Sequence, residues 1–417
     1  MPSSPRPLST MLDAMRRPRL VGLLVVGALV AADAVRLCAA DVQPPLLLAH
    51  VMPWFEADPQ ARTWGWHWTM NRFDPNKVVD GRREIAAKFQ PAIGPYDSAD
   101  PLVVEHQLLT MKLAGIDGVI VDWYGRAELW DHARNHRCTQ LVVDRAAELG
   151  MRVAICYEDK TVGDLVKEGR IKAEDRVAHA AAEIGWLAKH WFPRSHYVRL
   201  DGRPVLLSFG HEGLSDDEWS RVLAGTSEPI AYFSEHRRRP TAVGGFDWPV
   251  PQEGLAAQEW FARESRDWPG RIAVAFPRFV DIYAEAGVHP SWGRIDDDGG
   301  RTFARTLDIA LATGPSIVQI ATWNDWGEGT MIEPSVEFGT RDLELLQRTR
   351  RRLSPGFAAT REHLALPGRL LALRRSAPAA DAPRRARLDA VAAQLARLDL
   401  AAAAAALEAI EAAAGDR

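Results

Sequence analysis

The residues with the clearest chemical potential lie in the segment Trp323–Pro334, which follows an apolar run and holds three carboxylates within nine residues. Hydrolysis of a glycosidic bond requires one carboxylic acid that protonates the leaving oxygen and a second carboxylate that acts as nucleophile or base. Asp325 and Glu328 are candidates for this pair, because a strand end followed by a tight turn at Gly327 and Gly329 can direct both side chains into one cleft. The spacing therefore indicates glycosidase chemistry. The alternative is a loop-capping Asp beside a surface Glu.

Other side chains of the same segment are suited to binding a sugar. Trp323 and Trp326 flank the acidic pair and could stack on sugar rings while excluding water. A lower local dielectric raises the pKa of a neighbouring carboxyl, which keeps one of the two protonated near neutral pH. Asn324 and Glu333 are further candidates for contacts with the substrate, although a Glu directly before a Pro more often has a structural role.

The elements that must position these residues can be read from the hydrophobic pattern. Between about residue 44 and residue 353, short apolar runs alternate with amphipathic stretches, as in repeated βα units around a parallel sheet. Eight runs are present: Leu46–Val51, Gly118–Trp123, Val153–Glu158, Pro204–Phe209, Ile230–Glu235, Gly244–Trp248, Ile272–Phe276 and Ile317–Trp323. This number predicts an α/β protein with a closed (β/α)8 TIM barrel and a C-terminal α-helical extension.

Polar or aromatic side chains close several of these runs. Barrel enzymes place their chemistry at the C-terminal ends of the strands, because all eight strands point to one face. We therefore expect contacts with a sugar from the residues at these ends, namely His50, Asp122, Trp123, Tyr124, Glu158 and Glu235. The alternative is that strands end where polar loops begin, but this does not account for acids next to Trp.

The overall composition restricts the class of partner. The 15 Trp outnumber the 13 Phe and the 6 Tyr, which suits either stacking platforms for sugars or the filling of a large core. A formal net charge of −4 provides no strong positive field for nucleic acid. No Cys/His cluster has zinc spacing, so neither a metal nor another cofactor is expected. The run Asp296–Asp298 is interpreted as a flexible acidic loop rather than a calcium site.

The two ends of the chain differ from the barrel region. Arg16, Arg17 and Arg19 precede the apolar stretch Leu20–Ala32, which predicts a signal peptide over residues 1–40. A signal peptide predicts export to the periplasm or the exterior, and no stable membrane association is expected after its cleavage. The alternative is an uncleaved membrane anchor. Residues 41–355 would then form the barrel and residues 356–417 an Ala- and Arg-rich helical tail.

Within this tail, residues 357–375 are expected to be helical and residues 384–414 to form one long helix, after a linker. This tail could pack on the barrel, mediate self-association or remain a solvated helix. Of the three cysteines, Cys138 and Cys156 follow the signal peptide and are expected to be buried free thiols.

The segment Trp323–Pro334 resembles the signature of glycoside hydrolase family 99, the endo-α-mannosidases, and of the related α-1,3-glucanases of family 71. The resemblance continues upstream and covers most of residues 46–335 in order. It includes Tyr96-Asp97-Ser98, Ala114–Gly118, Trp123-Tyr124-Gly125, Tyr157-Glu158 and Tyr197–Val205.

This resemblance implies roles for three carboxylates. Glu328 matches the general acid/base of the endo-α-mannosidases, and Asp325 matches the residue that deprotonates the 2-hydroxyl of the sugar. The implied reaction cleaves α-linked mannose or glucose units internally, with retention through an epoxide-like intermediate. Glu158 matches a carboxylate that lines the sugar site. The chain departs from the family pattern at Asp325, where that family has Glu, and at Gly327, where it usually has His.

Two other interpretations remain open from the sequence. The barrel could bind carbohydrate without turnover, with Asp325 as the inactivating change. It could instead be a glycosyltransferase-associated protein of polysaccharide assembly, although no convincing glycine-rich phosphate loop is present. Each interpretation has an oligo- or polysaccharide as its partner.

Overall fold

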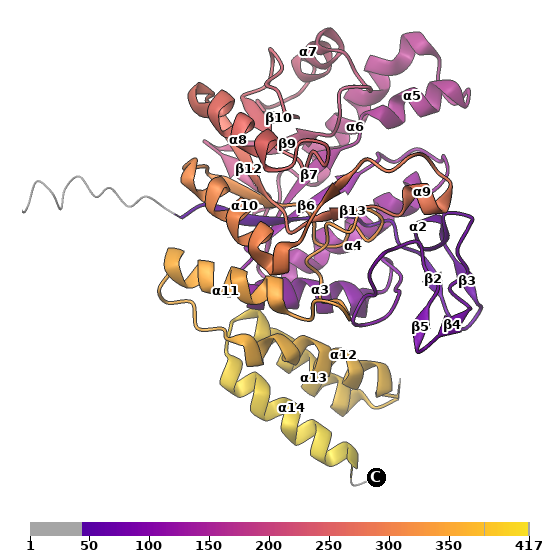
Figure 1. Cartoon of the computed structure of the whole chain (residues 1–417), viewed down its shortest axis with the longest axis vertical. Coiled ribbons are helices and arrows are strands. Elements are labelled where there is room, and N and C mark those ends of the chain that lie inside the picture. The colour runs from indigo at the N-terminus through magenta and orange to yellow at the C-terminus, as the bar shows by residue number, and fades with distance from the viewer. Residues whose placement is uncertain (1–43, 379, 416–417) are drawn as a thin grey trace, which may run out of the picture. The chain divides into compact units, whose positions relative to one another are not determined.

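Eight parallel strands close into a barrel in the computed structural model, which describes residues 44–378 and 380–415 (Figure 1). In the order of their pairing, the strands are β1 (Leu46–Val51), β6 (Gly118–Trp123), β7 (Arg152–Tyr157), β9 (Arg203–Ser208), β10 (Ala231–Glu235), β11 (Gly244–Phe246), β12 (Gly270–Ala275) and β15 (Ile317–Ile320). β15 pairs with β1 and completes the circle. All eight predicted runs are strands, so the predicted (β/α)8 fold is confirmed.

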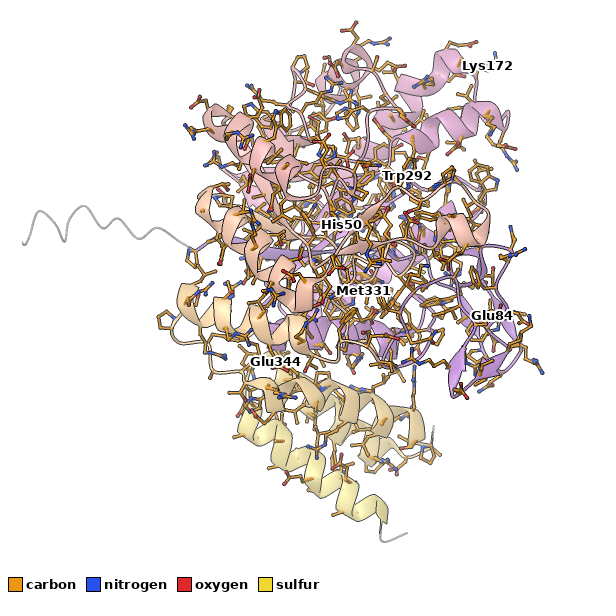
Figure 2. The ribbon with its side chains drawn as sticks, viewed as in Figure 1. His50, Glu84, Lys172, Trp292, Met331 and Glu344 are labelled. Atoms are coloured by element: carbon orange, nitrogen blue, oxygen red, sulfur yellow. The ribbon has the colours of Figure 1, made fainter. Side chains whose placement is uncertain are left out.

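The strands are buried on both faces, as expected for a parallel barrel covered by helices. In β1, Leu47 and Ala49 pack in the hydrophobic cluster under the helices, whereas Leu48 packs in the cluster that fills the barrel. Successive side chains of a strand point to opposite faces, so His50 points inward like Leu48. His50 lies in the barrel interior, and Figure 2 labels it there.

Helices follow the strands and cover the barrel. They are α3 (Pro101–Ala114), α4 (His132–Glu148), α5 (Lys160–Lys167), α6 (Arg176–His190), α7 (Asp216–Ala224), α8 (Leu255–Glu264), α10 (Arg301–Ala312) and α11 (Arg341–Leu353). The sequence sets their ends locally. Asp100 accepts a hydrogen bond from the Leu102 amide at the start of α3, and Gly115 ends that helix at φ 87°. Ser215 and Glu218 form a capping box at the start of α7.

Two long connections at the C-terminal ends of the strands carry small elements of their own. The connection from β1 to α3 contains β2 (Ala57–Asp58), β3 (Thr63–Trp64), α2 (Trp66–Thr69), β4 (Val78–Val79) and β5 (Arg82–Arg83). The connection from β12 to α10 contains β13 (Phe279–Val280), α9 (Tyr283–Ala286) and β14 (Arg294–Ile295). A further short strand, β8 (Arg199–Leu200), pairs with β9 in antiparallel orientation.

The C-terminal extension consists of α12 (Leu366–Ser376), α13 (Ala382–Ala396) and α14 (Leu400–Gly415); α12 and α13 pack against α3 of the barrel, and α14 packs against α12 and α13. Arg374 of α12 donates to Glu105 of α3 at 2.6 Å, and Leu388 and Leu395 of α13 belong to the cluster that includes the barrel helices. Figure 1 shows α12 beside α3. The predicted single helix over residues 384–414 is wrong, because Leu398 at φ 59° interrupts it.

The remaining predictions about the ends of the chain and about cysteines stand as follows. The predicted signal peptide lies outside the described residues. Within residues 44–378 and 380–415, no helix is both long and apolar enough to cross a membrane. Cys138 and Cys156 are free and buried, as predicted.

Candidate active site

The predicted acidic pair lies in a pocket at the C-terminal ends of the barrel strands. Asp325 and Glu328 line it together with Asp122, Tyr124 and Glu158, which the sequence also predicted as site residues. Its volume is about 190 Å³. The other lining residues are Met52, Trp54, Phe55, Trp66, His67, Met70, Lys160, Phe209, Trp248, Tyr283 and Gly327.

Two grooves adjoin the pocket. One groove of about 590 Å³ shares Tyr124 with the pocket and extends to Trp130 and Asp131. The other, also of about 590 Å³, shares Glu328 and extends past Glu235 to Trp292. Trp130 is 64% exposed and Trp292 is 50% exposed, so both grooves have an aromatic rim; Figure 2 labels Trp292. The pocket of the acidic pair is therefore continuous with surface grooves that offer aromatic contacts.

The loop after β15 holds the pair through its own hydrogen bonds. The Thr322 amide donates to the Thr330 carbonyl at 3.1 Å and closes the loop at its base. The Asp325 amide donates to Thr322 Oγ1 at 2.8 Å, and the Glu328 amide donates to Asp325 Oδ1 at 2.9 Å. At Gly329, φ is 67° and an added Cβ would lie 2.7 Å from the Val280 carbonyl oxygen, so only glycine fits. The predicted tight turn is thus present.

Burial and mutual repulsion separate the two carboxyl groups in acidity. Burial raises the pKa of Asp325 to about 6. Burial raises the pKa of Glu328 well above its ordinary value, and the nearby charges of Asp325 and Asp281 raise it further. A pair of this kind has one group that retains its proton and one that releases it at lower pH. This is the division of labour that acid/base catalysis requires.

A lysine offsets part of the negative charge in the pocket. Lys160 Nζ forms an ion pair with Glu158 Oε2 at 2.7 Å. Although burial opposes the charge of Lys160, the carboxylates of Glu158, Asp122 and Glu328 raise its pKa. Burial and the neighbouring Glu158 raise the pKa of Asp122 well above its ordinary value. Lys160 was not predicted, although its position two residues after Glu158 could have indicated it.

Glu235 and His50 border the pocket rather than line it. Glu235 lines the groove that also contains Glu328, and it accepts a hydrogen bond from the Gly210 amide at 2.9 Å. His50 is fully buried inside the barrel and contacts the Trp248 ring edge-on, with 4.8 Å between the ring centroids. The predicted direct contact of His50 with a sugar is therefore not supported.

The predicted contacts of Trp123, Trp323 and Trp326 with a sugar are wrong. Trp123, Trp323 and Trp326 are fully buried and do not line the pocket. Trp123 follows the inward-pointing Asp122 on the same strand, so its ring points outward and packs against Trp191 under the helices. Other aromatic residues face the cleft instead. One of them is Trp54, whose ring stacks on His67 with 4.5 Å between centroids.

Asn324 and Glu333 also have structural positions rather than the predicted contacts with substrate. Asn324 accepts from the Met52 amide at 2.8 Å and donates to the Met52 carbonyl at 2.9 Å, which ties the loop to the end of β1. Glu333 accepts from Tyr96 Oη at 2.7 Å and from Gln107 Nε2 at 2.8 Å. Neither residue lines the pocket.

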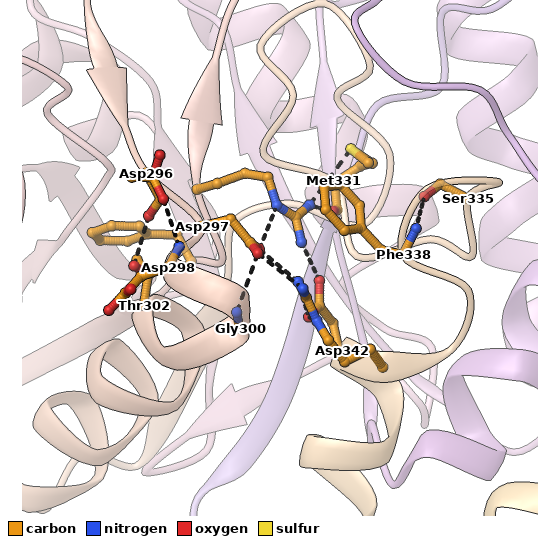
Figure 3. A network of polar contacts seen from close by, with 12 residues as sticks. Asp296, Asp297, Asp298, Gly300, Thr302, Met331, Ser335, Phe338 and Asp342 are labelled. Atoms are coloured by element: carbon orange, nitrogen blue, oxygen red, sulfur yellow. Dashed lines mark hydrogen bonds and ion pairs between the residues drawn. The ribbon is translucent and has the colours of Figure 1, made fainter.

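A buried arginine supports the loop from the side of β13. Arg278 donates to the Met331 carbonyl at 2.7 Å, pairs with Asp342 and donates to Asp297 Oδ1 at 3.0 Å (Figure 3). Arg341 also donates to Asp297, at 2.9 Å. The acidic run that was interpreted as a flexible loop is therefore anchored at its central residue by two arginines.

Of the other pocket residues, Trp66 and His67 belong to an aromatic cluster that is visible in the sequence. Tyr283 had no signal there, because it comes from the long connection after β12. Barrel closure brings this connection over the end of β15, where the Ile282 amide donates to the Gly327 carbonyl at 3.0 Å.

Comparisons with known proteins agree with this fold. Residues 52–228 match the family model of glycosyl hydrolase family 99. A glycoprotein endo-alpha-1,2-mannosidase-like protein of Danio rerio is 23% identical over 278 residues, which cover 61% of this chain and 60% of that protein. A glycoprotein endo-alpha-1,2-mannosidase of Xenopus laevis is 20% identical over 286 residues, covering 63% and 61%. The chain thus spans about three fifths of the length of these relatives.

A solved structure shares the fold over a larger part of its length. The GH99 endo-alpha-mannosidase from Bacteroides thetaiotaomicron superposes with a TM-score of 0.56 at 17% identity, covering 75% of this chain and 97% of that one. A glycoside hydrolase-like protein has a TM-score of 0.51 at 14% identity, covering 73% and 94%. These findings confirm the predicted barrel and the predicted resemblance to family 99.

Proposed function

We propose that this chain, a relative of glycosyl hydrolase family 99, hydrolyses α-linked mannose or glucose units within an oligo- or polysaccharide and retains the anomeric configuration. The observation that carries the proposal is the position of Asp325 and Glu328 in one pocket. Burial raises the pKa of both carboxyl groups, and the charge of Asp325 raises the pKa of Glu328 further. The relationship to the family 99 hydrolases supports the same reaction class.

In the first step, Glu328 is the general acid and Asp325 the base. Asp325 takes the proton of the sugar 2-hydroxyl, and the 2-oxygen attacks the anomeric carbon. The glycosidic bond breaks as Glu328 gives its proton to the leaving oxygen. The product on the enzyme is a 1,2-anhydro sugar. A buried carboxyl with a raised pKa is suited to this donation.

In the second step, water opens the anhydro sugar from the opposite face. The carboxylate of Glu328 accepts a proton from the water, and the protonated Asp325 returns its proton to the 2-oxygen. Two inversions at the anomeric carbon give net retention. Both carboxyl groups end in their starting protonation states, so the cycle balances.

The surrounding residues would hold the sugar in this position. Asp122, Tyr124 and Glu158 line the same pocket and offer hydrogen-bonding groups for hydroxyls. Lys160 keeps Glu158 in place through its ion pair and reduces the repulsion among the carboxylates. The two grooves that adjoin the pocket favour cleavage inside a chain, because they offer room for further sugar units beyond the one at the acidic pair.

The experiment uses the full chain beside Glu328→Gln on α-mannans, α-glucans and bacterial exopolysaccharides. We expect the native protein to release reducing ends as oligosaccharides, with the initial product anomer matching that of the substrate by NMR. The variant should lose at least about three orders of magnitude in rate. Monosaccharide release alone would contradict internal cleavage. Binding of a glycan by both proteins without release from any substrate would instead support a carbohydrate-binding barrel without turnover.

A further inference from the structure

Three potential metal ligands meet at the floor of the pocket, inside the barrel. His50, Asp122 and Cys156 come from the adjacent strands β1, β6 and β7, and each is at most 1% exposed. One ligand atom from each residue lies within 4.8 Å of the other two. The strand register places Asp122 directly opposite Cys156. Imidazole, carboxylate and thiol thus converge from three strands on one point.

The hydrogen bond of His50 leaves one ring nitrogen available. His50 Nδ1 lies 3.2 Å from Gln319 Oε1, and Gln319 Nε2 donates to the Asp247 carbonyl at 3.2 Å, which orients the amide. Nδ1 therefore carries the proton, and Nε2 presents a lone pair. Within the described chain, Nε2 has no hydrogen-bond partner. Metal-binding histidines have this arrangement, in which the second ring N–H donates to an oxygen acceptor.

Asp122 faces this lone pair with two acceptor oxygens, and neither has a hydrogen-bond partner among the described residues. A buried carboxylate without donors is costly, so Asp122 either keeps a proton or binds a cation at this point. The charged side chains around this point are mainly negative, which also favours a bound cation. Asp325, Glu328 and Glu158 line the pocket above, whereas Lys160 is the one lysine or arginine among the described residues that lines it.

We propose that His50 Nε2, the Asp122 carboxylate and the Cys156 thiolate bind a divalent transition-metal cation of the zinc class. A nitrogen and a sulfur ligand favour zinc, cobalt or a similar ion over magnesium or calcium. Binding replaces the proton of the Cys156 thiol, and that of Asp122 where this carboxyl is protonated, by bonds to the metal, and the displaced protons are released to solvent. Because Asp122 also lines the pocket, one position of the ion would be accessible from the cleft. The inference does not depend on the hydrolase activity.

The spacing of these residues explains why the sequence did not indicate the site. Zinc motifs are recognised from ligands a few residues apart. Here the ligands are separated by 72 residues (50 to 122) and 34 residues (122 to 156), one from each strand. The pairing of β1 with β6, and of β6 with β7, brings them together.

Cobalt is the probe for the test, because a cobalt–thiolate bond has a near-ultraviolet charge-transfer band that nitrogen and oxygen ligands lack. The full chain is freed of metal with a chelator and titrated with Co²⁺. We expect a charge-transfer band that saturates at one equivalent and disappears when Zn²⁺ is added. Affinity should increase with pH, since a proton is displaced.

Matched cysteine variants assign the band. Cys156→Ser should abolish it, whereas Cys138→Ser and Cys38→Ser should retain it. His50→Gln should weaken Co²⁺ binding by at least about tenfold, and it provides a second assignment if Cys156→Ser does not fold. The thermal midpoint of the native protein should rise with Zn²⁺, and that of Cys156→Ser should not. A native protein without the band, or a band that survives both Cys156→Ser and His50→Gln, would overturn the proposal.

Discussion

Two glutamates of the same loop, Glu328 and Glu333, have opposite environments. Glu333 is buried, whereas Glu328 is partly exposed in the pocket. The carboxylate of Glu333 accepts hydrogen bonds from Tyr96, Gln107 and Trp326. Glu328 Oε2 lacks a hydrogen-bond partner within the described part of the chain. Since buried polar groups are normally paired, the unpaired oxygen marks the glutamate that is available to a ligand, and the paired one marks an anchor.

The same contrast divides the whole loop into a pocket face and a wall face. Asp325, Gly327 and Glu328 form the pocket face and line the cavity. Asn324 and Glu333 belong to the wall face, with side chains bonded to β1 and α3 neighbours. Hydrogen bonding therefore distinguishes the acidic residues that face the pocket from those that support the loop, even within one short segment.

The largest effect should come from comparing Glu328→Gln with Glu333→Gln. Loss of the general acid should lower kcat by about three orders of magnitude or more, with little change in KM, whereas Glu333→Gln should stay within about tenfold of the native rate. A glycosyl fluoride substrate needs no protonation of its leaving group, so it should recover most of the first step in Glu328→Gln. Equal losses in both variants would remove the distinction between the two faces.

A second large effect is expected for Asp325→Asn. The amide cannot take the proton of the 2-hydroxyl, so kcat should fall by roughly 100-fold or more. The variant retains an oxygen that accepts from the Glu328 amide, so the loop should keep its shape and the thermal midpoint should change little. Kinetics on a 2-deoxy substrate supply the control, because the native enzyme should then be as impaired as the variant. Native-like rates in Asp325→Asn would exclude Asp325 as the base.

A smaller effect concerns the single pocket lysine and the pH–rate profile. Lys160 lowers the pKa values of Asp122 and Glu328 by its charge, so Lys160→Met should raise them. The limb of the profile that reports deprotonation of the acid should then move to higher pH, by up to about one unit. Lys167→Met, an exposed lysine on the same helix, is the matched control and should leave the profile unchanged. A shift toward lower pH would contradict the assigned electrostatics.

The smallest effect tests the wall face through stability. Burial raises the pKa of Glu333 to about 7 in the folded protein, despite the hydrogen bonds that lower it. A raised folded-state pKa means that its contribution is complete below the unfolded-state value near 4.5 and is lost as pH rises through 7. Glu333→Gln should therefore flatten the decline in unfolding free energy between pH 4.5 and 7 by roughly 1–3 kcal/mol. Denaturant unfolding measures this slope, with the exposed Glu212→Gln as control. An unchanged slope would show that Glu333 does not cause the decline in unfolding free energy.

Local patterns in the sequence were sufficient for the barrel and for the position of the acidic pair. Apolar runs with β-branched residues predicted seven of the eight strands, as expected for strands that are buried on both faces, whereas Gly244–Trp248 contains none. The pair follows β15 directly, so its place at the C-terminal face was determined once the strand was known. Alternation along a strand also places Asp122 and Trp123 on opposite faces, so only one of the two can face the cleft.

Only the tertiary structure decided which side chains meet. Trp323 and Trp326 lie in a loop, where no period assigns a face, and their burial depends on Tyr96 and the core around them. Tyr283 reaches the pocket from a connection more than forty residues before Glu328 (283 to 328). His50, Asp122 and Cys156 converge because β1 pairs with β6 and β6 pairs with β7 in parallel. The sequence therefore determined the strands and the phase of each one, whereas contacts between distant residues required the folded sheet, because spacing along a chain does not measure distance in space.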